Sequence, residues 1–475
     1  AATRSGLASN TTYFLVVNAV NHNGVPSAFM AMGSTSTLAM PPATIVSTFS
    51  ALGTDGFTVA WSTNGNGVTA TAYTVRVSTD LNNFSADYSQ SDSTAPVGAN
   101  PQYTFTGLYA NATYFLQVRT VGNQNTTPFL NMGSTSTLAA APGTKLSTFS
   151  AVAVDGFTVA WSTNNNIVSF TSYTVQVSTD PNNFSALLSM SMTTLPLGSE
   201  PQYAFSGLQS NTTYFFRVRT EGNGNITAFT DLGSTSTLAN IPGTAVTTFT
   251  AVDISSMSVS WDRGNNAVSL TTYTVVLSTG STYPNTFAGN MSLTTAPVGA
   301  LPAATRSGLA GNTTYFLFVS AVNHNGVTTA FAALGSTVTL ANPPVSTVST
   351  FSAVLTNALT GAWDGNGNGA GTLYEAVVSS EQAFPNAHAG NVSVSTRPEG
   401  APSAPFSSLS ANTTYYLFAR AISHAGVPTA HAVLGATVTL VNPPTTAVTT
   451  FTAVTTASLT AAWSANGNGA GTQYS

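Results

Sequence analysis

The amino-acid sequence predicts an all-β protein built of consecutive β-sandwich domains. Three observations support this prediction: a repeat of about one hundred residues, short segments in which apolar and polar residues alternate, and turn signals between those segments. No part of the chain shows a convincing helical pattern. The repeat therefore indicates the size of a domain, and the alternation indicates strands.

The repeat is clearest in a segment that occurs five times. "SNTTYFLVVNAV" at residues 9–20 returns as "ANATYFLQVRTV", "SNTTYFFRVRTE", "GNTTYFLFVSAV" and "ANTTYYLFARAI". Successive copies are 100 or 101 residues apart, which is the length of one small domain. Linkers that contain proline begin the units at the same interval. The predicted domains are therefore 41–140, 141–240, 241–342 and 343–442, with parts of a domain at 1–40 and 443–475.

Within a unit, the strands are predicted by alternation with a period of two. "GFTVAWS" places Phe57, Val59 and Trp61 on one face, and "AYTVRVSTD" does the same with Tyr73. "TYFLQVRTV" follows the same pattern. The dipeptide at 55–56, Asp-Gly, signals a tight turn before the tryptophan strand. About seven short strands per unit indicate a sandwich of two sheets.

These residues resemble a fibronectin type III domain, which carries a core Trp on its second strand, a core Tyr on its third and a tyrosine corner before its sixth. The proline of that corner is missing in all five copies, so a looser turn is expected. The resemblance implies seven-stranded Greek-key sandwiches of the fibronectin type III or immunoglobulin-like kind. The strand pairs that match it are Trp61/Tyr73, Trp161/Tyr173, Trp261/Tyr273, Trp363/Tyr374 and Trp463/Tyr474, and the corner pairs are Leu7/Tyr13, Leu108/Tyr114, Leu208/Tyr214, Leu309/Tyr315 and Leu409/Tyr415.

The composition excludes several classes of function. Only 5% of the residues are charged and the net charge is −5, so a nucleic-acid partner is not expected. The chain has no cysteine, which excludes disulfides, zinc–thiolate sites and thiol catalysis. The carboxylates are too sparse for a calcium cage, and no serine–histidine–aspartate set is apparent. We expect no enzyme activity, no cofactor and no membrane span in this segment.

Two sets of polar residues are candidates for contacts or modification. His22, His324 and His424 share one loop position, either as a contact site or as polar turn residues. Eleven sequons of the form Asn-x-Ser/Thr are either glycan sites or the result of chance and turn preference. Five of them precede the tyrosine-corner strand, where a glycan is expected to project into solvent. The eleven are Asn10, Asn83, Asn111, Asn125, Asn183, Asn211, Asn225, Asn290, Asn312, Asn391 and Asn412.

The predicted function is structural: an extracellular or cell-surface fibre, filament or stalk of repeated sandwiches. Short proline linkers limit hinge motion, and the near-neutral surface favours self-association into a fibre or lattice. The partial domains at both ends suggest a longer array, or end domains completed by a neighbouring copy. The alternative is an adhesin whose loops "NHNGV" and "TNGNG" bind a glycan or a protein on another cell; an enzyme is the most remote alternative.

Overall fold

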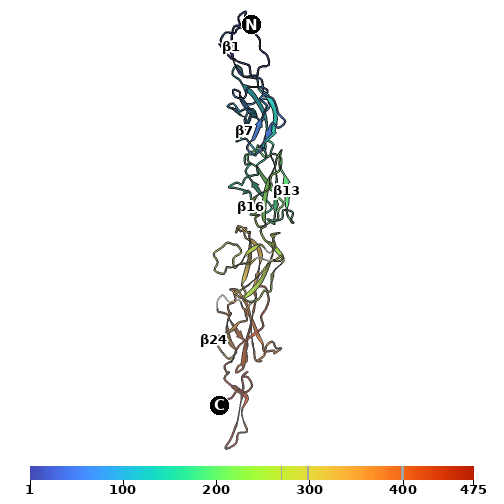
Figure 1. Cartoon of the computed structure of the whole chain (residues 1–475). Coiled ribbons are helices and arrows are strands. Elements are labelled where there is room, and N and C mark those ends of the chain that lie inside the picture. The colour runs from blue at the N-terminus through green and yellow to red at the C-terminus, as the bar shows by residue number, and fades with distance from the viewer. Residues whose placement is uncertain (269, 297–298, 397–400) are drawn as a thin grey trace. The chain divides into compact units, whose positions relative to one another are not determined.

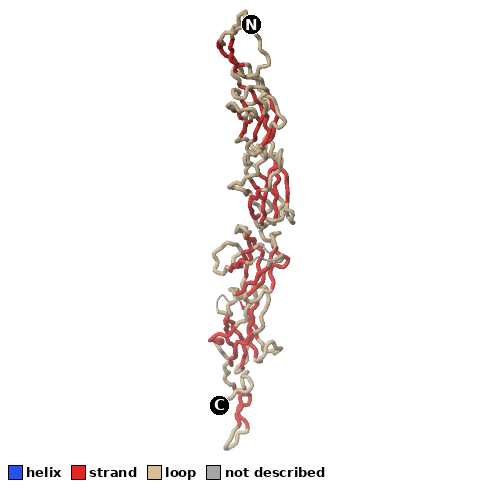
Figure 2. Tube along the Cα trace, viewed as in Figure 1, coloured by secondary structure: helices blue, strands red, loops and turns tan. Residues whose placement is uncertain are grey.

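The computed structural model describes residues 1–268, 270–296, 299–396 and 401–475, and its regular structure in these residues consists of strands joined by loops (Figure 2). No helix long and apolar enough to cross a membrane is found in these stretches. The chain divides into two compact units, residues 1–238 and 239–475, called here the N-terminal unit and the C-terminal unit. The prediction of an all-β fold of tandem sandwiches is confirmed.

The N-terminal unit begins with a hairpin and continues with two sandwiches, which Figure 1 marks with the labels β1, β7, β13 and β16. The hairpin pairs β1 (Thr12–Val17) with β2 (Met30–Ser36). The first sandwich has a small sheet in the order β3 (Phe49–Ser50), β4 (Phe57–Ala60), β7 (Gln102–Phe105), and a large sheet in the order β6 (Gln90–Ser93), β5 (Ala72–Ser78), β8 (Thr113–Val121), β9 (Leu130–Ser136). The second has β10 (Phe149–Ser150), β11 (Phe157–Ala160), β14 (Gln202–Phe205), and β13 (Met190–Thr193), β12 (Ser172–Ser178), β15 (Thr213–Glu221), β16 (Thr230–Ser236).

The C-terminal unit holds two further sandwiches and a final two-stranded sheet. The third sandwich has β17 (Gly243–Thr250), β18 (Ser256–Asp262), β21 (Ala303–Ser307), and β20 (Met291–Thr294), β19 (Thr272–Ser278), β22 (Thr314–Val322), β23 (Ala332–Val338). The fourth has β24 (Val345–Ser352), β25 (Ala358–Asp364), β28 (Ser403–Ser407), and β27 (Val392–Thr396), β26 (Leu373–Ser379), β29 (Thr414–Ile422), β30 (Ala432–Val438). The final sheet pairs β31 (Thr445–Thr452) with β32 (Thr460–Ser464).

Each complete sandwich encloses its own cluster of buried apolar residues. In the first sandwich the indole of Trp61 lies edge-on to the ring of Tyr73, with ring centroids 5.2 Å apart. The other four Trp–Tyr pairs have centroids 5.3 to 5.8 Å apart. In the complete sandwiches the tryptophans are at most 2% exposed, as are Tyr73, Tyr173 and Tyr273, while Tyr374 is 4% exposed. Alternation places these aromatic rings on the inner faces because successive side chains of a strand point to opposite sides.

All five tyrosine corners close without the proline of the corner motif. In each copy the tyrosine hydroxyl accepts a hydrogen bond from the backbone N–H five residues earlier, at 2.8 to 3.0 Å. These hydroxyls belong to Tyr13, Tyr114, Tyr214, Tyr315 and Tyr415. The bond fixes the turn that precedes the long strand, so the looser turn expected from the missing proline is not observed.

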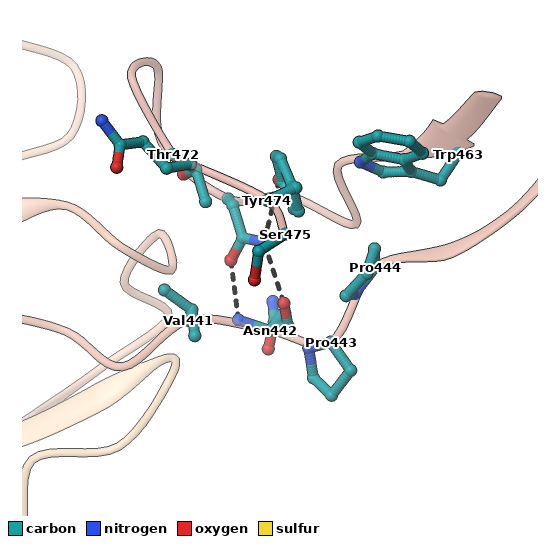
Figure 3. A pocket seen from close by; sticks show the side chains of 10 residues that line it. Val441, Asn442, Pro443, Pro444, Trp463, Thr472, Tyr474 and Ser475 are labelled. Carbon is teal, nitrogen blue, oxygen red and sulfur yellow. Dashed lines mark hydrogen bonds between the residues drawn. The ribbon is translucent and has the colours of Figure 1, made fainter. Parts of the chain in front are cut away.

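Four of the predicted core and corner residues are not buried. Trp463 is 49% exposed and Leu7 is 43% exposed, and Tyr13 and Tyr474 are only half-buried. The reason is that 443–475 and 1–40 each supply a single two-stranded sheet, with no opposing sheet to cover its apolar face. Beside Trp463 this uncovered face forms a pocket of about 500 Å³, whose walls include Pro444 and Tyr474 (Figure 3).

Candidate functional site: the junctions between consecutive sandwiches

The asparagine that opens the repeated segment lies at the end of its own sandwich and reaches into the next one. Asn10, Asn111 and Asn312 sit two residues before β1, β8 and β22, with φ of 46°, 54° and 46°. This left-handed region is unfavourable for most residues, and asparagine tolerates it better than other side chains. The backbone turn therefore selects asparagine at the point where two sandwiches meet.

The junction between the first and second sandwiches shows how this side chain is used. Asn111 is 0% exposed. Its Nδ2 donates to Thr171 Oγ1 at 3.0 Å, and its Oδ1 accepts the backbone N–H of Asn223 at 2.8 Å. Thr171 Oγ1 in turn donates to the carbonyl of Ile167. A buried carboxamide thus joins the corner of one sandwich to two separate loops of the next, with both of its polar ends satisfied.

The same bonds recur at the other junctions within each unit. Asn10 Nδ2 donates to Thr71 Oγ1 at 2.7 Å, and Asn10 Oδ1 accepts the N–H of Asn123 at 2.8 Å. Asn312 bonds Thr372 at 2.7 Å and the N–H of His424 at 2.6 Å. Asn412 bonds Thr472 at 2.6 Å. The repetition shows that the junction is a property of the repeat and not of one pair of domains.

Backbone hydrogen bonds cross the same junctions. The N–H of Gly67 donates to the carbonyl of Ser9 at 2.8 Å, and the N–H of Ile167 donates to the carbonyl of Ala110 at 2.9 Å. In the C-terminal unit Gly369 and Gly469 donate to the preceding sandwich at 3.0 and 2.7 Å. Each of these contacts is a single parallel bridge between neighbouring sandwiches. A short piece of inter-domain sheet therefore supports every side-chain clamp.

The linker itself is held by a second asparagine. Asn66 Oδ1 accepts the N–H of Met40 at 2.9 Å, and Asn66 Nδ2 donates to the carbonyl of the same residue at 2.8 Å. Asn125 makes the same pair of bonds with Ala39, at 2.7 and 3.2 Å. The carboxamide thus gives the N–H and the carbonyl of the linker backbone the hydrogen-bond partners that a neighbouring strand would otherwise provide. Positions equivalent to Asn66 clamp the later linkers: Asn166, Asn266, Asn368 and Asn468.

The last of these linker clamps is drawn in Figure 3, where Asn442 carries hydrogen bonds beside the two prolines of its linker. Asn468 Oδ1 accepts the N–H of Asn442 at 2.7 Å and Asn468 Nδ2 donates to its carbonyl at 2.9 Å. Asn466 Nδ2 donates to the carbonyl of Pro443 at 2.8 Å. Proline restricts the linker dihedrals while the asparagines satisfy its carbonyls.

Most of the predicted sequons do not present a free side-chain nitrogen to solvent. Asn10, Asn111, Asn211 and Asn312 are 0% exposed, and Asn412 is half-buried with its Nδ2 bonded, so these side chains do not project into solvent as expected. Asn125 and Asn225 clamp linkers through the same amide group. The amide nitrogens of Asn290 and Asn391 donate to Asn285 and Asn386, both at 2.7 Å.

Two sequons remain open. Asn83 and Asn183 are exposed, and their Oδ1 atoms accept the N–H of Ser85 and Ser185 at 3.0 Å. This bond leaves the amide nitrogen, the atom to which a glycan attaches, on the solvent side of a local turn. The two residues occupy equivalent positions in the first and second sandwiches.

The three loop histidines lie in different settings. All three are exposed. Nε2 of His324 lies 3.2 Å from the carbonyl of Leu270 in its own sandwich. His424 contributes its backbone N–H to the junction with Asn312. The same loop provides the N–H groups of Asn123 and Asn223 at the other junctions. The loop position thus acts through its backbone, for which histidine is not required.

The junction contacts described here are electrically neutral, and charge is concentrated elsewhere. On the outer face of the large sheet, the guanidinium of Arg76 lies 3.6 Å from the ring centroid of Phe129, which Arg119 approaches at 4.5 Å. Burial and the charge of Arg119 lower the pKa of Arg76 below its usual value. Arg217 and Arg219 repeat this stacking on Phe229. In the described stretches no three His, Cys, Asp or Glu side chains gather in a metal-binding group.

The comparisons with known proteins find one family match and similar solved structures. The family model "Fibronectin type III domain" matches residues 141–231. Among solved structures, the FN1–FN3 domains of chicken CNTN1 share 14% identity at a TM-score of 0.24, covering 63% of this chain and 98% of that one. A two-domain fibronectin type III segment of chicken tenascin shares 17% identity at a TM-score of 0.30, covering 42% and 100%. The comparison with curated proteins finds no match. Fibronectin type III domains are common in extracellular and surface proteins.

Proposed function

We propose that the chain is a structural spacer, a segment of an extracellular or cell-surface fibre, filament or stalk, with no enzyme activity. The observation that carries this proposal is the buried asparagine clamp, which recurs at the junctions within both units. Flexibly linked domains have no need of hydrogen-bonded, largely buried carboxamides at their boundaries. A chain that spans a fixed distance or carries force benefits from rigid junctions between its domains.

The clamp also argues against the adhesin alternative. One candidate loop, "TNGNG", meets the preceding sandwich, because Gly67 donates to Ser9. Asn123, in the loop of the first sandwich that is equivalent to "NHNGV", donates to Asn10. A ligand would have to share these backbone groups with the junction. The contacts therefore favour the structural role.

The test is a measurement of junction rigidity in the full chain. Because the chain has no cysteine, Gln102→Cys and Gln202→Cys place one spin label on each of two consecutive sandwiches. We expect a narrow distribution of label distances, and a broader one in Asn111→Ala. This variant leaves Thr171 Oγ1 without its donor and the N–H of Asn223 without its acceptor, at a cost of about 1–3 kcal/mol.

The matched control is Asn83→Ala, which removes an exposed asparagine of the same sandwich and should leave the distribution unchanged. A double-mutant cycle that combines Asn111→Ala with Thr171→Ala, measured as free energies of unfolding, should give a coupling energy between the two residues of roughly 0.5–3 kcal/mol. A distribution that is already broad in the unmodified chain, or that Asn111→Ala does not alter, would contradict the structural role.

A further inference from the structure

One aliphatic side chain in each of the four complete sandwiches and in the final two-stranded sheet points fully into solvent, at the same position of the repeat. These side chains, called here the knob residues, have relative exposures of 106 to 108%. They are Val46, Leu146, Val246, Val348 and Val448. A single exposed aliphatic residue is ordinary on a protein surface. Its recurrence in all five copies is not explained by packing, because a fully exposed side chain contributes nothing to its own core.

The local structure shows how the knob is presented. In the third sandwich the pairing of β17 with β18 jumps from Thr244–Trp261 to Phe249–Val259, so four residues of β17 bulge out opposite Ser260. Thr248 Oγ1 closes the bulge by donating to the carbonyl of Ala245 at 3.3 Å. The other four copies have the same threonine–carbonyl bond, at 2.8 to 3.1 Å. The knob residue lies at the tip of this closed turn.

Protection of an edge strand does not account for the residue type. β3, β10, β17 and β24 are edge strands, and a bulge on an edge strand hinders pairing with other chains. Polar or charged residues serve that purpose better than aliphatic ones. The residue before the knob varies freely, as Ile45, Lys145, Ala245, Thr347 or Ala447. The knob itself is Val or Leu in every copy.

We propose that the knob residues form a lateral contact between two copies of this chain. This proposal rests on the structural role proposed above, because a fibre or filament is where copies of the chain would lie side by side. Burying one aliphatic side chain raises an association constant by about ten- to a hundredfold, which is less than the cost of bringing two molecules together. Several knobs must therefore engage one partner at once.

A second copy meets this requirement. It carries the same knob residues at the same sequence interval of about one hundred residues, so two copies can bring matching sets of knob residues together. A specific interface buries on the order of 800 Å² per partner, more than one bulge presents, so the contact extends over more than one sandwich. Charge does not oppose the pairing, because only 5% of the residues are charged and the net charge is −5.

The test compares self-association of the full chain and two variants by sedimentation velocity. In the knob variant all five knob residues are replaced by serine. In the control variant Leu187, Leu195 and Leu301, which are 81 to 90% exposed outside the bulges, are replaced by serine. We expect the unmodified chain to associate, the knob variant to bind itself at least a hundredfold more weakly, and the control to change by less than about threefold. Unchanged thermal unfolding shows that the variants fold.

The proposal is overturned if the unmodified chain stays monomeric at every concentration, if the knob variant associates as well as the unmodified chain, or if the control loses association equally. A photo-crosslinker at position 146, in a mixture of isotopically light and heavy chains, adds a second readout. Crosslinks between light and heavy chains at one defined surface support the contact, and scattered crosslinks overturn it. The spin-label distances measured in the knob variant separate this result from a failure of the structural role, because they report on the junctions alone.

Discussion

At the residue scale, the buried tyrosines make the folded protein less stable at alkaline pH. Tyr173 is 1% exposed, and burial raises its pKa to about 12. Its hydroxyl has no hydrogen-bond partner among the described residues. Burial also raises the pKa of Tyr73, Tyr114 and Tyr214 in the N-terminal unit. The folded state therefore holds these protons more tightly than the unfolded state does.

The first prediction follows from the sign of this shift. A raised pKa in the folded state stabilises the protein below the unfolded pKa of about 10, and this stability is lost as the pH rises from about 10 to about 12. For Tyr173 the loss is about 2–3 kcal/mol. The loss is measured as the free energy of urea unfolding at a series of pH values, with hydrogen exchange used to assign the unfolding to the second sandwich. In Tyr173→Phe the decline should be smaller; an equal decline would show that Tyr173 does not cause it.

The second prediction concerns modification of the sequons. When the chain is secreted from a glycosylating eukaryotic cell, we expect glycans at Asn83 and Asn183, the two exposed sequons. Occupancy should be near zero in the folded chain at Asn10, Asn111, Asn312 and Asn412, because their amides are buried or already bonded at the junctions. Mass spectrometry of glycopeptides gives site-by-site occupancy. High occupancy at Asn111 in correctly folded chain would show that the clamp does not form.

At the scale of elements, one glycine decides how a strand begins. A Cβ added to Gly56 would lie 2.1 Å from the carbonyl oxygen of Phe105, at the start of β4. The equivalent position in the fourth sandwich is Ala358, and there the strand β25 begins one residue earlier and pairs with Ser407. The glycine therefore permits the backbone at position 56 to lie close to that of Phe105. The fourth sandwich, with alanine at this position, continues the strand pairing there instead.

The third prediction uses a matched pair of glycines in the same loop. Gly56→Ala should destabilise the first sandwich by about 1–3 kcal/mol, because backbone atoms must move to admit the methyl group. In Gly53→Ala the nearest heavy atom lies at an ordinary 3.4 Å, and we expect a change of less than about 0.5 kcal/mol. Denaturant unfolding of the two variants provides the comparison, and equal effects would refute the argument from close approach.

At the scale of the whole molecule, stability is distributed over separate cores. Four clusters of buried apolar residues account for the core of the four complete sandwiches. The first cluster also contains Ile167, which belongs to the linker-facing loop of the second sandwich. The first and second sandwiches are thus coupled through the side chain of Ile167 as well as through the asparagine clamp.

The fourth prediction separates local from global unfolding. Trp61→Ala should cost the first sandwich about 3–5 kcal/mol, because it opens a cavity beside Tyr73. Hydrogen exchange by mass spectrometry should show lost protection in residues 41–140, a smaller loss in the contacting loops of the second sandwich, and none in the C-terminal unit. Uniform loss of protection along the whole chain would mean that the sandwiches unfold as one.

The repeat, the strands and the Trp–Tyr pairs could be predicted from the sequence, because a period of two places the indole of Trp61 and the phenol of Tyr73 on inner faces. The role of the repeated asparagines could not. Asn83 and Asn111 belong to the same kind of motif, yet one is exposed and the other is buried. The difference lies in the neighbouring sandwich, which supplies Thr171 and the N–H of Asn223 to Asn111 and nothing to Asn83. Burial at a junction is a property of two domains together, so only the tertiary structure decides it.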